Sequence, residues 1–237
     1  MGRDVLRLNN VTLAWGNKTI LSDMNGCFKQ GSFTAIVGPN GAGKSTLIKA
    51  IAGQLPVKSG EITFAEEFKR ELSLLPQYTE LDRDFPMTTF DLVSMGIWRD
   101  LGPFKSLSGE QRHRIMQAIV QVGLVEQAQD LIGSLSGGQL QRAFFARLLV
   151  RDAQVIVLDE PFAAVDEDTQ ERLLPILQTW HEQGRTILVV LHDEELVRRL
   201  VPETLIIGRG IVAWGATEDV FTVDNMRQAQ RLCRSIY

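Results

Sequence analysis

The chain has 237 residues, of which 44% are hydrophobic and 23% charged, which is long enough for one sizeable core and a smaller appended lobe. Its formal net charge is −4 and its lysines and arginines are dispersed, so nucleic acid is not expected as a partner. No apolar run approaches the ~20 residues of a membrane-spanning helix, and no hydrophobic secretory region follows the N-terminus. We therefore expect a cytoplasmic protein, or one docked on the cytosolic face of a membrane.

Turn residues divide the first third of the chain into segments rich in β-formers. These segments predict strands at residues 5–13, 19–21, 32–37 and 72–75. Residues 44–52 have helical character, and Gly53 is a suitable C-terminal stop. The two cysteines, Cys27 and Cys233, are far apart and lack a metal-like spacing, so they are expected to be reduced cytosolic thiols, with Cys27 half-buried in a strand.

The character of the sequence changes between about Thr88 and Val150, where strand signals vanish. Three helical stretches follow one another, and each begins with a pair that fits a capping box. The pairs are Thr88 with Asp91, Ser108 with Gln111, and Ser136 with Gln139. Apolar strands at 155–158 and 186–191, with a polar-faced helix at 167–181 between them, are typical of a covered parallel sheet. A strand pair at 203–214 and short helices beyond it complete an α/β core interrupted by an all-helical insert.

Residues 38–45 fit the pattern G-x-x-x-x-G-K-[ST] in full, between a predicted strand and a predicted helix. The glycines let the backbone wrap closely, so that its N–H groups point at phosphate oxygens, and the helix adds its N-terminal dipole. Lys44 is expected to reach the β- and γ-phosphates of ATP, and the Ser45 hydroxyl to ligate Mg²⁺. The expected ATP contacts are Gly38, Pro39, Asn40, Gly41, Ala42, Gly43, Lys44, Ser45 and Thr46.

Two adjacent carboxylates follow the apolar strand at 155–158, at the strand end where ligands bind in open α/β sheets. Asp159 is suited to hold Mg²⁺ through water, and Glu160 to act as general base or to orient the attacking water. Adjacent acids after a strand are often only a solvated turn, but beside a complete phosphate loop they predict hydrolysis of ATP.

Many kinases and GTPases share these two elements, so they establish nucleotide binding but not the class. The discriminating feature is Leu-Ser-Gly-Gly-Gln at residues 135–139, which precedes a helix and, a strand later, the acid pair. Ser136 can cap that helix, and Gly137 and Gly138 leave backbone N–H groups uncovered for an anion. In these features the chain resembles the ATP-binding cassette family, and the resemblance covers nearly its whole length. A small-molecule kinase would not account for residues 135–139.

The resemblance implies roles for further residues. Trp15 lies where the family has an aromatic that stacks on adenine, although an aromatic near a turn is also commonly a core residue. Gln77 resembles the Q-loop glutamine, which contacts ATP and its Mg²⁺. Asp166, within residues 163–166, resembles the D-loop that communicates across a dimer. His192, at a strand end, resembles the switch histidine that contacts the γ-phosphate.

The resemblance also implies that Ser136, Gly137, Gly138 and Gln139 contact ATP held by a second copy of the chain, so that a head-to-tail dimer encloses two ATP molecules. The implied fold is a phosphate-loop NTPase (RecA-like) core with an N-terminal antiparallel β part and an inserted α-helical subdomain. The expected parts are a nucleotide-binding core at 1–85 and 151–216, a helical subdomain at 86–150 and a short C-terminal helical tail at 217–237. The helical subdomain is expected to receive a membrane permease.

A second stretch, residues 107–112, resembles the signature at 135–139 at first glance. It has Glu110 where the second glycine is required, and a negative side chain there would repel a γ-phosphate. We interpret it as an ordinary capping box, formed by Ser108 and Gln111 at the start of a helix.

The transported substrate is indicated only by local similarity. Residues 84–86, 88 and 91–96, together with 159–162 and 165–166, look like the cassettes of zinc, manganese and iron importers, which also use an extracytoplasmic substrate-binding protein. The cassettes for ferric-siderophore, haem and cobalamin import are the alternative. A cassette ATPase of DNA repair or translation is a third possibility, although such relatives usually carry two cassettes or long coiled coils.

Overall fold

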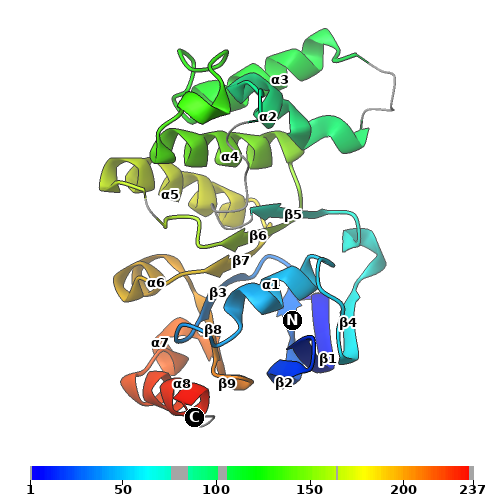
Figure 1. Cartoon of the computed structure of the whole chain (residues 1–237), viewed down its shortest axis with the longest axis vertical. Coiled ribbons are helices and arrows are strands. Elements are labelled where there is room, and N and C mark those ends of the chain that lie inside the picture. The colour runs from blue at the N-terminus through cyan, green and yellow to red at the C-terminus, as the bar shows by residue number, and fades with distance from the viewer. Residues whose placement is uncertain (1, 76–84, 101–105, 164, 235–237) are drawn as a thin grey trace. The chain divides into compact units, whose positions relative to one another are not determined.

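The computed structural model describes residues 2–75, 85–100, 106–163 and 165–234. Its chain divides into two compact units. The first comprises Met1–Leu74, Gln154–Glu160 and Trp180–Tyr237, and the second comprises Leu75–Ala153 and Pro161–Thr179. Figure 1 labels the elements of both units.

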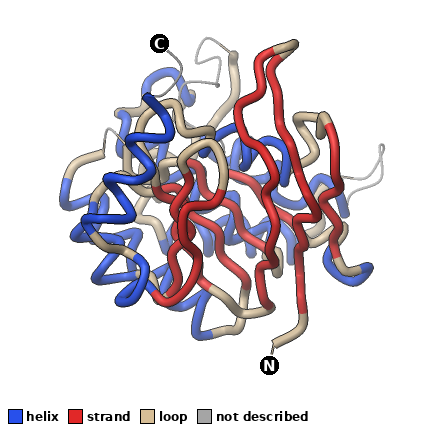
Figure 2. The backbone as a smooth tube through the Cα atoms, turned by 90° about the horizontal axis from the view of Figure 1, so that it is seen from below, coloured by secondary structure: helices blue, strands red, loops and turns tan. Residues whose placement is uncertain are grey.

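A three-stranded antiparallel sheet with the order β2-β1-β4 opens the first unit (Figure 2). It is built from β1 (Asp4–Trp15), β2 (Lys18–Lys29) and β4 (Ser59–Phe64). The hairpin pairs Leu6 with Phe28, which places alternating apolar side chains of both strands on the buried face. Cys27 is half-buried in β2, as expected.

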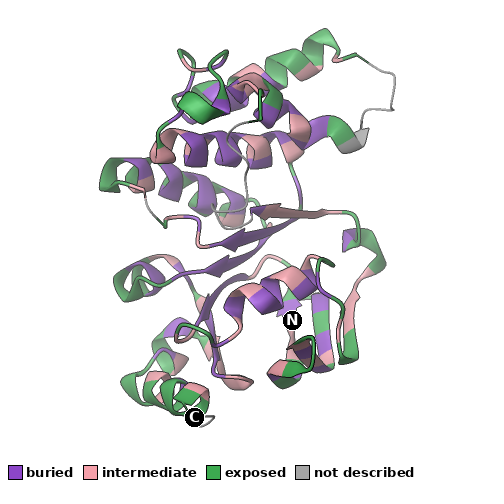
Figure 3. Cartoon of the chain, viewed as in Figure 1, coloured by how far each residue is buried: buried purple, intermediate pink, exposed green. Residues whose placement is uncertain are grey.

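A six-stranded sheet with the order β5-β6-β7-β3-β8-β9 forms the second layer. Its strands are β3 (Phe33–Val37), β5 (Leu72–Leu75), β6 (Val155–Asp159), β7 (Thr186–Val190), β8 (Glu203–Ile207) and β9 (Ile211–Ala216). The central strands run parallel, and β9 turns back antiparallel to β8. Every residue of β3, β6 and β7 is buried, as Figure 3 shows for β6 and β7. This accounts for their predominantly apolar sequences.

One cluster of buried side chains joins both sheets to helix α1 (Lys44–Ile51). It includes Leu6 and Phe28 from the hairpin, Leu47 from α1, and Val157 and Val190 from the parallel strands. The helix ends near Gly53, whose φ of 72° is the left-handed conformation expected of a glycine stop. The remaining helices of this unit are η1 (Glu66–Phe68), α6 (Glu194–Leu200), α7 (Thr217–Val220) and α8 (Val223–Arg234).

The second unit is helical. It contains α2 (Thr89–Ser94), η3 (Met95–Asp100), α3 (Gly109–Gln121), η4 (Ile132–Ser134), α4 (Gly137–Arg151) and most of α5 (Glu167–Glu182). Helix α4 packs against both α2 and α3 and buries Leu140, Phe144 and Phe145. All three predicted capping boxes are present, at the starts of α2, α3 and α4. The stretch at 107–112 is therefore confirmed as the beginning of a helix.

Two elements differ from the sequence-based expectation. Strand β4 was not predicted, because half of its residues are exposed and its sequence begins Ser-Gly-Glu. Strand β2 is much longer than the predicted 19–21, because it continues through register shifts and through Asp23, which has a φ of 52°. Such irregularities hide the alternating pattern of a strand.

Candidate functional site

The phosphate loop joins the end of β3 to the start of α1. Gly38 needs to be glycine, because an added Cβ would lie 2.3 Å from the Ile207 carbonyl oxygen. Gly43, the N-cap of α1, has a φ of 102°, and an added Cβ there would lie 2.8 Å from Leu21 Cγ. No side chain caps this helix end, so the N–H groups of its first turn stay available to an anion.

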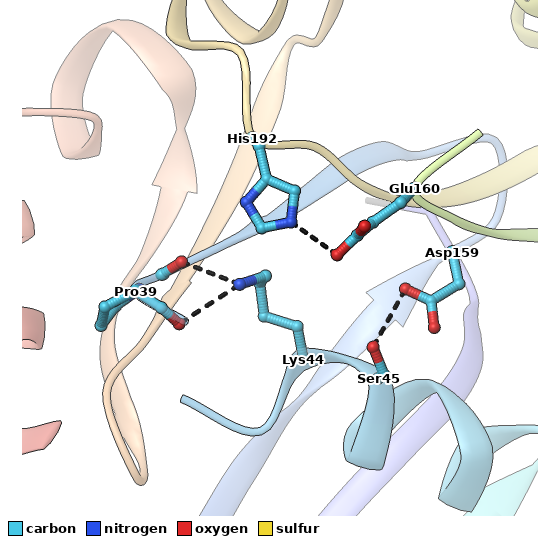
Figure 4. A network of polar contacts seen from close by, with 7 residues as sticks. Pro39, Lys44, Ser45, Asp159, Glu160 and His192 are labelled. Carbon is cyan, nitrogen blue, oxygen red and sulfur yellow. Dashed lines mark hydrogen bonds and ion pairs between the residues drawn. The ribbon is translucent and has the colours of Figure 1, made fainter. Parts of the chain in front are cut away.

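Lys44 curls back over the loop (Figure 4). Its Nζ donates to the carbonyl oxygens of Gly38 at 2.9 Å and Pro39 at 3.2 Å. The residue is buried, and burial lowers the pKa of its ammonium, while Glu160 and Asp159 act in the opposite direction. The ammonium is thus held at the mouth of the loop by two neutral acceptors, which a phosphate oxygen can replace.

Asp159 ends β6 beside the first turn of α1. Its Oδ1 accepts a hydrogen bond from Ser45 Oγ at 3.3 Å. The carboxyl is only 2% exposed, and burial is the main reason that its pKa is raised, with a smaller contribution from Glu160. The Ser45 hydrogen bond lowers that pKa. A partly buried hydroxyl and a buried carboxylate side by side are hard oxygen ligands, and a divalent cation would relieve the cost of burying the negative charge.

Glu160 and His192 face each other across the mouth of the site (Figure 4). His192 Nε2 lies 2.5 Å from Glu160 Oε1. His192 follows the buried strand β7 and is exposed, whereas the side chain of Glu160 is only 17% exposed. Glu160 has a φ of 52°, in the left-handed region that non-glycine residues seldom adopt. Such strain is commonly found at functional positions.

The phosphate loop and Glu160 line an open pocket of about 390 Å³, within the range of small-ligand sites. Its lining residues are Ile20, Asn40, Gly41, Gly43, Lys44, Ser45, Thr46 and Glu160. Ile20 was not among the predicted site residues, since an apolar residue in a strand carries no such signal. Trp15 is 53% exposed, so it is not a core residue, and its Nε1 lies 3.3 Å from Thr46 Oγ1.

The signature at 135–139 and Asp166 lie in the second unit. Ser136 caps α4, its Oγ accepting from the Gln139 backbone at 3.2 Å, and Gln139 Oε1 accepts from the Ser136 backbone at 2.8 Å. Gly138 packs closely on the start of α5, because an added Cβ would lie 2.7 Å from Thr169 Oγ1. Asp166 accepts from the Thr169 backbone at 2.7 Å, and this bond is the main cause of its lowered pKa.

The structure thus brings the phosphate loop, Asp159, Glu160 and His192 together in the first unit, and the signature and Asp166 together in the second. Gln77 lies outside the described residues. Within the described ranges no cluster of His, Cys, Asp and Glu side chains could hold a metal ion on its own. None of the helices there combines the length and hydropathy that crossing a membrane requires.

A parallel sheet, a phosphate loop leading into a helix, and an acid pair at the end of another strand of the same sheet define a phosphate-loop NTPase. A family model described as ABC transporter matches residues 21–163. The chain is 39% identical over 228 residues to the zinc transport system ATP-binding protein TroB of Treponema pallidum, covering 94% of this chain and 86% of that protein. It is 37% identical over 227 residues to the manganese transport system ATP-binding protein MntB of Bacillus subtilis, covering 94% and 91%.

The fold agrees with solved cassettes. A transporter assigned to the metal-chelate ABC type, in an inward-facing conformation, gives a TM-score of 0.85 at 25% identity, covering 97% of this chain and 90% of that one. The ATP-binding cassette MJ1267 in its ADP conformation gives 0.78 at 23% identity, covering 97% and 99%. The chain belongs to the ABC transporter family, and it is an ATP-hydrolysing cassette of that family.

Proposed function

We propose that this chain is the ATPase subunit of an importer of a divalent metal ion, zinc, manganese or iron, and that it works with a separate membrane permease. The observation that carries the proposal is the polar cluster of the first unit. Lys44, Ser45 and Glu160 line one pocket, Asp159 accepts a hydrogen bond from Ser45, and His192 contacts Glu160. Relatives that match almost the full chain are named for zinc and manganese transport.

The phosphates of ATP bind at the N-terminus of α1. The uncapped N–H groups of its first turn and the Lys44 ammonium supply the positive charge, and Gly38 and Gly43 allow close approach of the backbone. Trp15 stacks on the adenine from the tip of the β1–β2 hairpin, close to Thr46. Trp15 is 53% exposed, which supports this contact of its indole with a ligand.

Ser45 and Asp159 fit a magnesium ion, and Gln77 is expected to join them. Bound Mg²⁺ neutralises charge on the β- and γ-phosphates. Ser45 would hold the ion with its hydroxyl, and Asp159 would hold it with its carboxylate. The hydrogen bond between Ser45 and Asp159 keeps both groups oriented toward the same point before the ion binds.

Hydrolysis uses Glu160 and His192. Glu160 accepts a proton from a water whose oxygen attacks the γ-phosphorus, and the bond from that phosphorus to the β–γ bridging oxygen breaks to release ADP. His192 then contacts the γ-phosphate. The 2.5 Å contact of His192 with Glu160, which lines the pocket, supports a shared role for the two groups.

The site becomes complete when a second copy of the chain joins it. Ser136, Gly137, Gly138 and Gln139 lie at the start of α4, and that helix end meets the γ-phosphate of ATP held by the other copy. Asp166, packed beside Gly138, lies at the same interface. ATP binding closes this head-to-tail dimer, and hydrolysis opens it.

The permease docks on the second unit at the cytoplasmic face of the membrane. Phe85, Trp98 and Leu131 are large apolar side chains that are more than half exposed there. Phe85 and Leu131 belong to two segments joined by the bridge between Thr88 and Leu131. Exposed apolar residues that gather on one unit suit a protein partner. An extracytoplasmic substrate-binding protein completes the system without touching this chain.

Deleting the gene in the organism that encodes it tests the function. We expect the deletion strain to contain less zinc, manganese or iron, by elemental mass spectrometry, when grown under chelation. The wild-type gene restores the metal, whereas a Glu160→Gln gene, expressed at the same level, does not. Because of the likeness to a metal-chelate type transporter, import of a metal chelate is the second candidate. Loss of siderophore, haem or cobalamin uptake with normal uptake of free metal ions would favour it.

A further inference from the structure

We propose that Gln141 couples the two ATP sites of the dimer, by tying the helix that begins with the signature to the peptide directly after Glu160. The inference rests on the proposed function, since it requires a shared site. Gln141 acts as a positioning residue, because it holds backbone and touches neither ATP nor water in the site.

The contact is a buried hydrogen bond. Gln141, on α4, is 4% exposed, and its Nε2 donates to the Pro161 carbonyl oxygen at 2.6 Å. Pro161 is also buried and directly follows Glu160 in the chain. A buried amide that donates to a buried carbonyl fixes both groups, because losing the bond leaves an unpaired acceptor away from water.

A second contact holds the same segment. The ring of Phe145, one helical turn after Gln141, stacks on the ring of Phe162 with a centroid distance of 6.3 Å and an interplanar angle of 25°. The two residues that follow Glu160 are therefore both fastened to α4. Glu160 itself has a φ of 52° and precedes a proline, a conformation that persists only where neighbouring structure imposes it.

The same helix begins at the signature, a little more than one turn before Gln141. Ser136 caps α4 and precedes Gln141 by five residues, about 7.5 Å at ~1.5 Å per residue. In the dimer, the signature of one chain contacts the ATP of its partner, while Glu160 of that same chain serves its own ATP. Helix α4 thus contacts one site through Ser136 and orients the base of the other through Gln141. A shift of α4 when one ATP binds is carried to Glu160 by this bond.

A merely structural Gln141 would stabilise the second unit without linking the sites. The two roles predict different cooperativity between the ATP sites. If Gln141 couples the sites, Gln141→Leu lowers kcat about 10- to 100-fold through misplacement of Glu160, leaves the KM for ATP nearly unchanged, and lowers the Hill coefficient toward 1. Val150→Ala is the matched control, because Val150 is a buried residue at the far end of α4. It should lower Tm but keep kcat and cooperativity.

The experiment measures ATPase rate against ATP concentration, together with Tm, for the purified wild-type chain and both variants. An unchanged kcat or Hill coefficient in Gln141→Leu overturns the inference, as does an equal loss in Val150→Ala. A wild-type chain without ATPase activity would instead overturn the proposed function. Should Gln141→Leu fail to fold, Gln141→Glu tests the same bond: its carboxyl can donate only while protonated, so its kcat relative to wild type falls as the pH rises. A constant ratio overturns the inference.

Discussion

Replacing Lys44 with methionine should separate ATP affinity from stability. The substitution keeps the length and apolar stem of the side chain but removes the charge. It also removes the hydrogen bonds to the Gly38 and Pro39 carbonyl oxygens at 2.9 and 3.2 Å. Methionine leaves the backbone of α1 undisturbed, because both side chains are good helix formers.

The loss of affinity follows from the interaction of one charge with the phosphates. Two unit charges 4 Å apart interact by about 4 kcal/mol at an effective dielectric constant of ~20, and each ~1.4 kcal/mol corresponds to a tenfold change in Kd. Part of this energy is already used in the contacts to the two carbonyls. We therefore expect the Kd for ATP to rise roughly 100- to 1,000-fold.

The effect on folding should be small. Burial lowers the pKa of Lys44 below the 10.5 of a free lysine, so at neutral pH the charged ammonium weakens the folded state relative to a neutral side chain. Methionine removes this cost and also removes the two hydrogen bonds. We expect the opposing effects to cancel to within about 2 kcal/mol.

Fluorescence titration with a labelled ATP analogue, competed with ATP, gives the Kd, and thermal unfolding gives Tm. A Kd for Lys44→Met within threefold of the wild-type value would refute the role given to the ammonium. A large fall in Tm that accompanies the loss of ATP affinity would refute the expectation that Lys44→Met changes affinity and leaves stability nearly unchanged.

Three further substitutions address the rest of the site. Asp159→Asn should stabilise the ATP-free protein at pH 7 by about 1–2 kcal/mol, because it removes a buried charge; the pKa of Asp159 is raised by burial, so this gain shrinks as the pH falls through that pKa toward 3.8. Gly138→Ala should abolish ATP-driven dimerisation while its own phosphate loop still binds ATP, because its Cβ would press on Thr169, whereas Gly109→Ala has nothing within 4 Å and should be silent. Trp15→Ala should weaken ATP binding about tenfold through lost stacking, but not the binding of inorganic triphosphate.

For each of these three predictions, one result would contradict the reasoning. A gain from Asp159→Asn that persists unchanged at pH 3.5 would exclude the titration of Asp159 as its cause. Equal dimerisation of Gly138→Ala and Gly109→Ala, by size-exclusion chromatography with ATP, would mean that the close packing on α5 has no function. Equal losses for ATP and triphosphate in Trp15→Ala would place the indole on the phosphates instead of the base.

Much of the first unit could be predicted because the sequence patterns that indicate its strands and its phosphate loop lie within short segments of the chain. Strands β6 and β7 are continuous apolar runs, and the phosphate loop is one uninterrupted motif. The capping boxes of the second unit depend on residues three positions apart, so they too are visible in the sequence. The position of Asp159 beside Ser45 followed from the rule that functional groups gather at the carboxyl ends of parallel strands.

What escaped prediction depends on tertiary contacts. Strand β4 is paired on one edge only, and its polar sequence makes sense only once β1 is beside it. The left-handed backbone of Glu160 has no signature in a glutamate before a proline. In the sequence, Gln141 is one polar residue on a predicted helix. Its hydrogen-bond partner, the carbonyl of Pro161, is 20 residues away in the chain, so the sequence gives no sign of the bond.

The proposal that one ATP site is built from two chains can be tested by mixing two defective variants. One chain carries Lys44→Met and the other Ser136→Arg, and both carry Glu160→Gln so that bound ATP is retained. In a mixed dimer the intact phosphate loop of the second chain meets the intact signature of the first. We expect neither variant alone to dimerise with ATP, and the mixture to form a dimer that retains one ATP. A mixture that stays monomeric, or a Ser136→Arg chain that dimerises by itself, would contradict the shared site.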